Sequence, residues 1–168
     1  FYDFWSQPQP GVEPEDSQRR AKLEQDLKLA ISSIGAYVER SDCLVVLAPG
    51  ATHVDRVNAD TGRREFTCYR TYRCRAFCVM EMTAANLSRR KTHPMLLIRS
   101  SEGIPQWISS LESHKLAVGE STFTCCERNH EGVFKECDRD VARVVLNRMI
   151  MMKTQYLFES GNVVLARL

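Results

Sequence analysis

Two short, unbroken apolar runs constrain the fold of this chain more than any other feature. They are CLVVLAPG (43–50) and MLLIRS (95–100). Each run is too short for a core helix, and its branched aliphatic residues favour a β-strand. Because neither run alternates with polar residues, both strands are expected to be buried on both faces. The chain is therefore predicted to form a sheet with helices on each side.

Helical segments are expected on either side of these strands. The segment 17–40 carries apolar residues at helical spacing, and a second helix is predicted to run from Tyr72 to Arg90. Asp138 is expected to N-cap a last helix over 139–158. Helices that alternate with buried strands are typical of an α/β domain with a mostly parallel central sheet.

The other segments complete one predicted domain over residues 1–168. They are the end of a strand at 1–5, a loop at 6–16, a long irregular loop at 51–67, a turn and short helix at 101–113, a strand within 115–126, and an edge strand near the C-terminus.

The composition is that of an ordinary globular domain. The chain has 168 residues, of which 43% are hydrophobic and 26% are charged, and its formal net charge is +2. A near-neutral chain has no general attraction to nucleic acid or membranes, and no apolar run approaches the roughly 18 residues of a membrane span. The N-terminus lacks a secretory pattern, so we expect a cytoplasmic location and reduced cysteines. Because the chain starts with Phe1, we expect it to be part of a longer protein.

Basic residues gather after the first apolar run. They are Arg63, Arg64, Arg70, Arg73 and Arg75. They form either a solvated face or a cradle for a phosphorylated ligand, since arginine binds phosphate through two parallel hydrogen bonds. Parallel sheets bind ligands at the carboxyl ends of their strands, which is where this segment begins.

One carboxylate, Glu81, stands out in the second helix. At about 100° per residue, Glu81 shares a helix face with Cys74 and Cys78 and borders the apolar stripe that contains Phe77. A half-buried acid near arginines is a candidate functional residue, but a structural ion pair gives the same pattern. Both alternatives stay open on these grounds.

The cysteine spacing gives little support for a metal site. Cys125, Cys126, His130 and Cys137 could supply four ligands, but adjacent cysteines rarely bind one tetrahedral ion. We therefore predict no metal and leave zinc binding by these four residues open. No cysteine lies in a recognisable nucleophile turn, which disfavours a Cys–His hydrolase.

Three motifs, in this order, resemble the Toll/interleukin-1 receptor (TIR) domain family. FYDFWSQPQPGVEPED (1–16) occupies the place of a strand and a loop that TIR domains use for partner contacts. Ser41 and LVVLAPG (44–50) are similar to the end of a TIR helix and its VVVLSP strand. FCVMEM (77–82) is similar to the family's WC-x-x-E-L helix, with Phe in place of Trp and Met in place of Leu.

The resemblance covers about residues 1–100, and 114–168 is expected to be a divergent C-terminal elaboration. It implies a flavodoxin-like, three-layer α/β domain. The family's first strand and helix would precede Phe1.

Two functions are implied by the resemblance. The first is an intracellular signalling and protein-interaction module that binds other TIR-like domains or itself, through a loop containing Ser6, Gln7, Pro8 and Gln9. The second is NAD cleavage, with NAD as substrate, no cofactor, and Glu81 as the catalytic carboxylate. We place the first function ahead because the family's nucleotide site also uses the first strand and helix.

A nucleotide ligand would give four further residues a role. His53, Arg70, Arg73 and Arg75 are expected to bind it beside Glu81. Cleavage of a glycosidic bond passes through an oxocarbenium-like state, which one carboxylate beside the ribose stabilises. Since nicotinamide is already cationic in NAD, no general acid is needed. The enzyme hypothesis predicts that Glu81 lines a cleft near His53 or Arg70.

Overall fold

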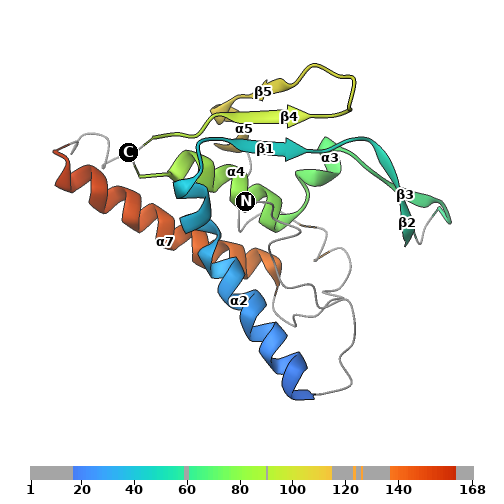
Figure 1. The fold of residues 1–168 in the computed structure, drawn as a ribbon, viewed down its shortest axis with the longest axis horizontal. Coiled ribbons are helices and arrows are strands. Elements are labelled where there is room, and N and C mark those ends of the chain that lie inside the picture. The colour runs from blue at the N-terminus through green and yellow to red at the C-terminus, as the bar shows by residue number, and fades with distance from the viewer. Residues whose placement is uncertain are drawn as a thin grey trace.

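The chain folds into a mixed α/β structure (Figure 1). The computed structural model describes residues 17–58, 61–89, 91–114, 123, 126 and 137–161. In chain order its elements are α2 (Ser17–Arg40), β1 (Leu44–Leu47), β2 (Ala51–Val57), β3 (Arg64–Thr67), α3 (Tyr69–Tyr72), α4 (Ala76–Leu87), β4 (Met95–Ile98), β5 (Gln106–Ile108), α5 (Ser110–His114) and α7 (Asp138–Glu159).

The main sheet is small and mixed. Its described strands lie in the order β1-β4-β5. β1 and β4 are parallel, with Leu44 opposite Met95, whereas β5 is antiparallel to β4. β5 follows β4 after a short turn, and a connection of this length permits only antiparallel pairing. The predicted parallel pair is therefore present, but the described sheet is not mostly parallel.

One hydrophobic core joins α2, α4 and α7 to the main sheet. α4 lies at its centre, and the side chains of Val79, Met80 and Met82 are fully buried. The helix predicted at 17–40 is confirmed as α2, and its buried stripe includes Leu27 and Ile34. The core is thus built between the sheet and one layer of helices.

Gly35 lies at the contact between α2 and α7. A Cβ atom at this position would come within 2.8 Å of the Met149 Sδ atom. α2 continues through Gly35 to Arg40 without interruption. The missing side chain therefore permits the close approach of the two helices.

β1 is buried on one face only, so the prediction of burial on both faces is wrong for this strand. Val46 is buried, whereas Val45 and Leu47 are 44% and 60% exposed. Val45, Leu96 and Trp107 are paired across β1, β4 and β5 and form one row on the open side. The unbroken apolar sequence of β1 is typical of a strand covered on both faces, but the described helices cover only one side of the sheet.

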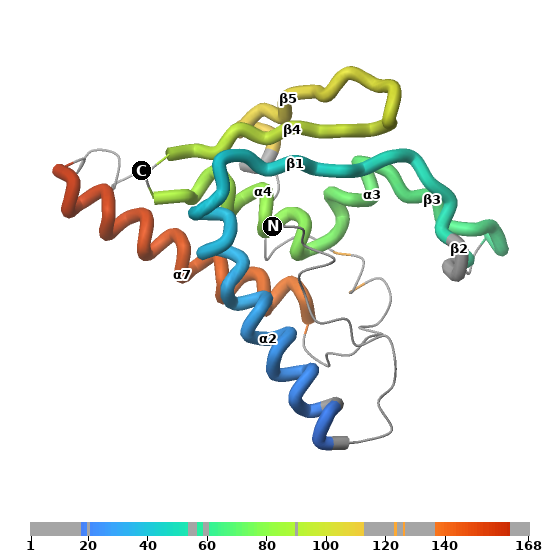
Figure 2. Tube along the Cα trace, in the orientation of Figure 1, coloured from blue at the N-terminus to red at the C-terminus, as the bar shows by residue number. Residues whose placement is uncertain are grey.

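The segment 51–67, expected to be an irregular loop, forms the antiparallel hairpin β2–β3. Its turn is closed by Asn58, whose Oδ1 accepts from the Thr61 N–H at 2.8 Å and whose carbonyl accepts from the Gly62 N–H at 2.9 Å. Gly62 has a φ of 63°, a conformation that favours glycine. Figure 2 shows the hairpin projecting from the end of the main sheet.

The single helix predicted from Tyr72 to Arg90 is two helices, α3 and α4. Arg75 has extended backbone angles (φ −103°, ψ 125°) and N-caps α4. α3 is a single turn that ends at Tyr72, and the Arg75 N–H donates to the Tyr72 carbonyl at 3.1 Å. Only α4 therefore continues through the predicted segment. α4 ends at Leu87, three residues before the predicted end at Arg90.

Two smaller expectations are corrected by the structure, for the segment 101–113 and for the bounds of the last helix. The segment 101–113 contains the strand β5 before the short helix α5. α7 begins one residue earlier than predicted, and Cys137 rather than Asp138 is its N-cap. α7 ends at Glu159, one residue later than predicted, with Ser160 as its C-cap and Gly161 at a φ of 77°.

Several predictions lie outside the described residues. They concern the strand end and loop within 1–16, including Ser6, Gln7, Pro8 and Gln9, most of the strand expected in 115–126, and the last segment after Gly161. Of the helices in the described part of the chain, none is long and apolar enough to cross a membrane.

Candidate functional site

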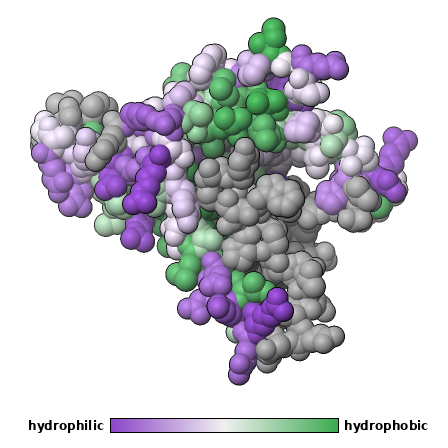
Figure 3. Space-filling view, in the orientation of Figure 1, coloured by the Kyte–Doolittle hydropathy of each residue, from purple (hydrophilic) through white to green (hydrophobic). Residues whose placement is uncertain are grey.

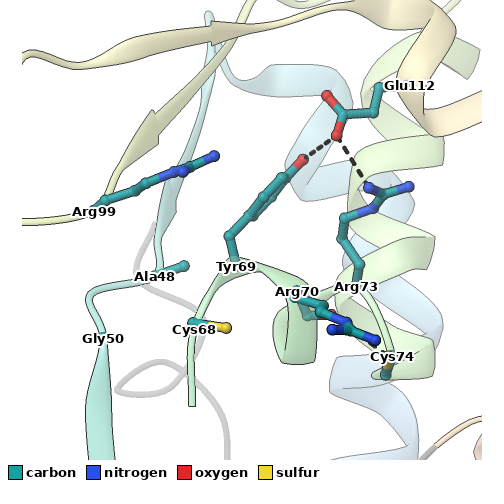
Figure 4. Close-up of a pocket in the computed structure, with 9 residues that line it drawn as sticks. All are labelled: Ala48, Gly50, Cys68, Tyr69, Arg70, Arg73, Cys74, Arg99 and Glu112. Carbon is teal, nitrogen blue, oxygen red and sulfur yellow. Dashed lines mark hydrogen bonds and ion pairs between the residues drawn. The ribbon is translucent and has the colours of Figure 1, made fainter. Parts of the chain in front are cut away.

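A pocket of about 570 Å³ lies where the parallel strands β1 and β4 end (Figure 4). The segment after β1 contributes Ala48 and Gly50, and Arg99 follows β4 directly. α3 and the turn after it supply most of the other lining residues, and Glu112 comes from α5. The pocket thus lies at the carboxyl ends of a parallel strand pair, a position at which ligands commonly bind in α/β folds.

Thr71 stabilises the start of α3, the short helix beside the pocket, through hydrogen bonds to the Cys68 backbone. Its Oγ1 atom accepts a hydrogen bond from the Cys68 backbone N–H at 2.8 Å and donates to the Cys68 carbonyl at 2.9 Å. The Thr71 backbone N–H also interacts with the Cys68 thiol and is the main cause of the lowered pKa of that thiol. Cys68 is thus more readily ionised than an ordinary cysteine.

Tyr69 lies at the centre of the site and is fixed by its neighbours. Its hydroxyl donates to the Glu112 Oε1 atom at 3.3 Å, and the same oxygen accepts from the Arg73 Nη1 atom at 3.2 Å. The guanidinium groups of Arg73 and Arg99 lie 5.9 and 5.7 Å from the ring centroid. Burial, followed by the charge of Glu112, raises the pKa of Tyr69 to about 12, so its hydroxyl remains a donor at neutral pH.

The structure brings together only some of the residues predicted to bind a ligand. Arg70 and Arg73 line the pocket. Arg75 is exposed and does not line it, and His53 is half-buried on the β2–β3 hairpin, also outside the lining. The pocket therefore contains two of the four residues predicted to bind a ligand, together with Arg99, which was not predicted.

Glu81 lies away from this pocket. It is on α4 with 9% of its surface exposed, and it lines neither the arginine pocket nor a second pocket between α2, α7 and the end of α4. It is the one buried carboxylate in the described part of the chain. The cleft beside Glu81 that the enzyme hypothesis predicts is thus not one of these two pockets.

Sequence reasoning missed Tyr69, Arg99 and Glu112 as site residues. Arg99 carried a usable signal, since it is the first residue after an apolar strand whose carboxyl end was expected to face a ligand. The sequence around Glu112 gave no signal of a site, because Glu112 lies 39 residues from its partner Arg73.

The candidate metal ligands are only partly described. The Sγ atoms of Cys126 and Cys137 lie 3.5 Å apart, while Cys125 and His130 are outside the described residues. No group of three or more His, Cys, Asp or Glu side chains suited to a metal occurs among the residues that the structure describes. The zinc alternative stays an open prediction.

The open face of the main sheet is the other candidate site. Its exposed members are Val45 (44%), Leu47 (60%) and Trp107 (71%), and Leu96 and Ile98 are half-buried beside them. Figure 3 shows hydrophobic side chains gathered over these strands. Among the described residues, β1 pairs only with β4 and is an edge strand.

Comparison of the chain with protein-family models, with curated proteins and with solved structures finds no match in any of the three.

Proposed function

We propose that this chain is a TIR-like protein-interaction module that acts in cytoplasmic signalling by binding a second copy of itself or another TIR-like domain. The observation that carries the proposal is the open apolar face of the main sheet, with Leu47 and Trp107 more than half exposed. The proposal includes a flavodoxin-like arrangement for the whole domain, in which the bound partner supplies the layer over the open face.

The chemistry of this face supports protein binding. Contiguous exposed apolar surface is uncommon on monomeric proteins and is typical of interaction sites. Trp107 gives a large ring of the kind that dominates binding energy at interfaces. Among the residues that the structure describes, one edge of β1 has no partner strand, and this edge offers backbone donors and acceptors to an added strand. Side chains and backbone thus both favour a protein partner.

The test is the mass of the chain in solution, measured by light scattering over a range of concentrations. We expect the wild type to self-associate, and Leu47→Gln and Trp107→Gln to shift it at least about tenfold toward monomer, since each removes apolar contact area. Leu29→Gln is the matched control, because Leu29 on α2 is 58% exposed but distant from the sheet face.

Two results would count against the module. One is a wild type that stays monomeric at high concentration and also fails to bind a TIR-like domain. The other is an equal effect of Leu29→Gln and Leu47→Gln, which would indicate non-specific association.

NAD cleavage is the second candidate function, and the burial of Glu81 favours it. A buried carboxylate is an uncommon and often functional group. In this proposal Glu81 stabilises the oxocarbenium-like ribose, while His53, Arg70, Arg73 and Arg75 bind the nucleotide. We rank it second because Glu81 does not line the pocket that contains Arg70 and Arg73.

An assay of free nicotinamide tests this second function. Wild-type chain at high concentration is expected to release nicotinamide from NAD, and Glu81→Gln to release at least about a hundredfold less. Glu102→Gln is the control, since Glu102 is an exposed carboxylate in the turn before β5. No release by the wild type would eliminate NAD cleavage by residues 1–168 alone.

A further inference from the structure

We propose that the pocket between β1, α3 and β4 binds the phosphate group of a small, soluble phosphorylated molecule. Three guanidinium groups, those of Arg70, Arg73 and Arg99, line the pocket with a single carboxylate, Glu112. The lining therefore carries an excess of positive charge on a chain that is nearly neutral as a whole. This site is separate from the open sheet face and from Glu81.

Two of the three arginines are available to a ligand. Glu112 already binds Tyr69 and Arg73, through hydrogen bonds of 3.3 and 3.2 Å. Neither Arg70 nor Arg99 forms an ion pair with any residue in the described part of the chain. Two unpaired guanidinium groups on one pocket favour an anion that offers several oxygens.

Arg73 contributes an unsatisfied donor. Its Nε atom is buried and has no hydrogen-bond partner among the described residues, although its Nη1 atom binds Glu112. A buried donor without a partner is unfavourable, and a ligand oxygen is one acceptor that removes the penalty. The unsatisfied Nε atom of Arg73 thus supports a site that binds an oxyanion.

The surroundings of Tyr69 favour the phosphate group over a base as the recognised part of the ligand. Figure 4 shows Arg73 and Arg99 on opposite sides of the ring, and the distances to its centroid are 5.9 and 5.7 Å. Because these two cations and the stacked ring of Tyr72, with its centroid 6.2 Å away, already surround the Tyr69 ring, it is a poor platform for stacking against a nucleobase. A volume of about 570 Å³ exceeds the needs of one phosphate, so a small phosphorylated molecule fits.

Calorimetric titration with pyrophosphate, at constant ionic strength, tests the proposal. Wild-type chain is expected to bind with saturation, and Arg70→Gln and Arg99→Gln to weaken binding at least about tenfold each. Arg19→Gln is the matched control, because it removes the same charge from an exposed side chain on α2 that does not line the pocket. Its affinity is expected to stay within about twofold of the wild type.

Further variants and ligands separate the proposal from simpler explanations. Arg99→Lys keeps the charge but loses the planar fork, so we expect it also to weaken binding. Thermal unfolding of each variant confirms that it is folded. Vesicles containing phosphorylated inositol lipids test the other source of a phosphate group.

Three outcomes would overturn the proposal. The first is the absence of saturable pyrophosphate binding by the wild type. The second is an equal loss in Arg19→Gln and Arg99→Gln, which would indicate diffuse attraction by surface charge. The third is binding to the phosphorylated vesicles without binding to pyrophosphate, which would exclude a soluble ligand.

Discussion

At the scale of single residues, His93 has the least expected environment in the described structure. Its side chain is only 2% exposed, and neither ring nitrogen forms a well-aligned hydrogen bond among the described residues, although the Asp42 backbone lies near enough to act on the ring. Burial lowers the pKa of His93 below its ordinary value of 6.5, and the charge of Lys91 lowers it further, while Glu39 and Asp42 act in the opposite direction. The ring is therefore held in its neutral form.

This burial predicts that the folded state loses stability in mild acid. Below about pH 6.5 the unfolded chain protonates His93 while the folded chain resists, so the unfolded state binds more protons and the free energy of unfolding falls as the pH drops. Urea unfolding between about pH 7.5 and 5 measures this loss. His93→Leu is expected to reduce the slope, whereas His53→Leu, on the hairpin, is expected to retain it.

The pair Cys126 and Cys137 predicts a second residue-level effect. Their Sγ atoms are 3.5 Å apart, and a disulfide requires about 2.05 Å, so a small movement brings them together. Incubation with glutathione disulfide is expected to form this bond, which peptide mapping under non-reducing conditions detects. Cys137→Ser should prevent it and Cys43→Ser, at an exposed position, should not. A linkage between other cysteines would contradict the prediction.

At the scale of elements, α4 organises the molecule. Most of its residues are buried, and it contacts both long helices α2 and α7. A cation from α7 lies just past its C-terminal end, since Lys153 Nζ donates to the carbonyl of the C-cap Ser88 and, at 3.0 Å, to that of Arg89. A positive charge at this helix end offsets the partial negative charge of its unpaired carbonyls.

Replacement of Lys153 tests how much this contact stabilises the fold. Lys153→Met keeps the length of the side chain but leaves the two carbonyls without their donor, so we expect a loss of about 1–2 kcal/mol in chemical unfolding. Lys91→Met is the control, because its ion pair with Asp42 is largely exposed and is expected to contribute less than about 1 kcal/mol. Equal losses would show that Lys153 acts as an ordinary surface charge.

At the scale of the whole molecule, the two faces of the sheet differ in what they contribute to stability. Val45 and Val46 are neighbours on β1, but one is 44% exposed and the other 2% exposed. Val46→Ala is expected to lower the free energy of unfolding by about 2 kcal/mol, and Val45→Ala by less than half of that. Because both variants lose the same β-propensity, their difference reports burial alone.

Much of this architecture could be predicted from the apolar pattern. The strands at LVVL and MLLI and the helix over 17–40 were predicted because apolar spacing carries their signal directly. The β2–β3 hairpin was missed because His53, Arg64 and Glu65 interrupt the alternation. Its turn residues Asn58 and Gly62 were the remaining clue.

The open sheet face and the pocket show where sequence reasoning fails. An apolar run specifies a strand that can be covered on both sides, but not whether other elements cover it. Arg70 and Arg73 were predicted because they lie close together in the chain. Their association with Arg99 and Glu112 depends on the pairing of β4 and the placement of α5, which are long-range features.

The parallel pairing of β1 with β4 has a consequence for synthesis of the chain. The 47 residues from 48 to 94 separate the two strands, so β1 leaves the ribosome a few seconds before its partner exists at roughly 5–20 residues per second. During this interval Leu44–Leu47 is an unpaired apolar strand, which is prone to aggregation. Slower translation of this interval should increase the demand for chaperones.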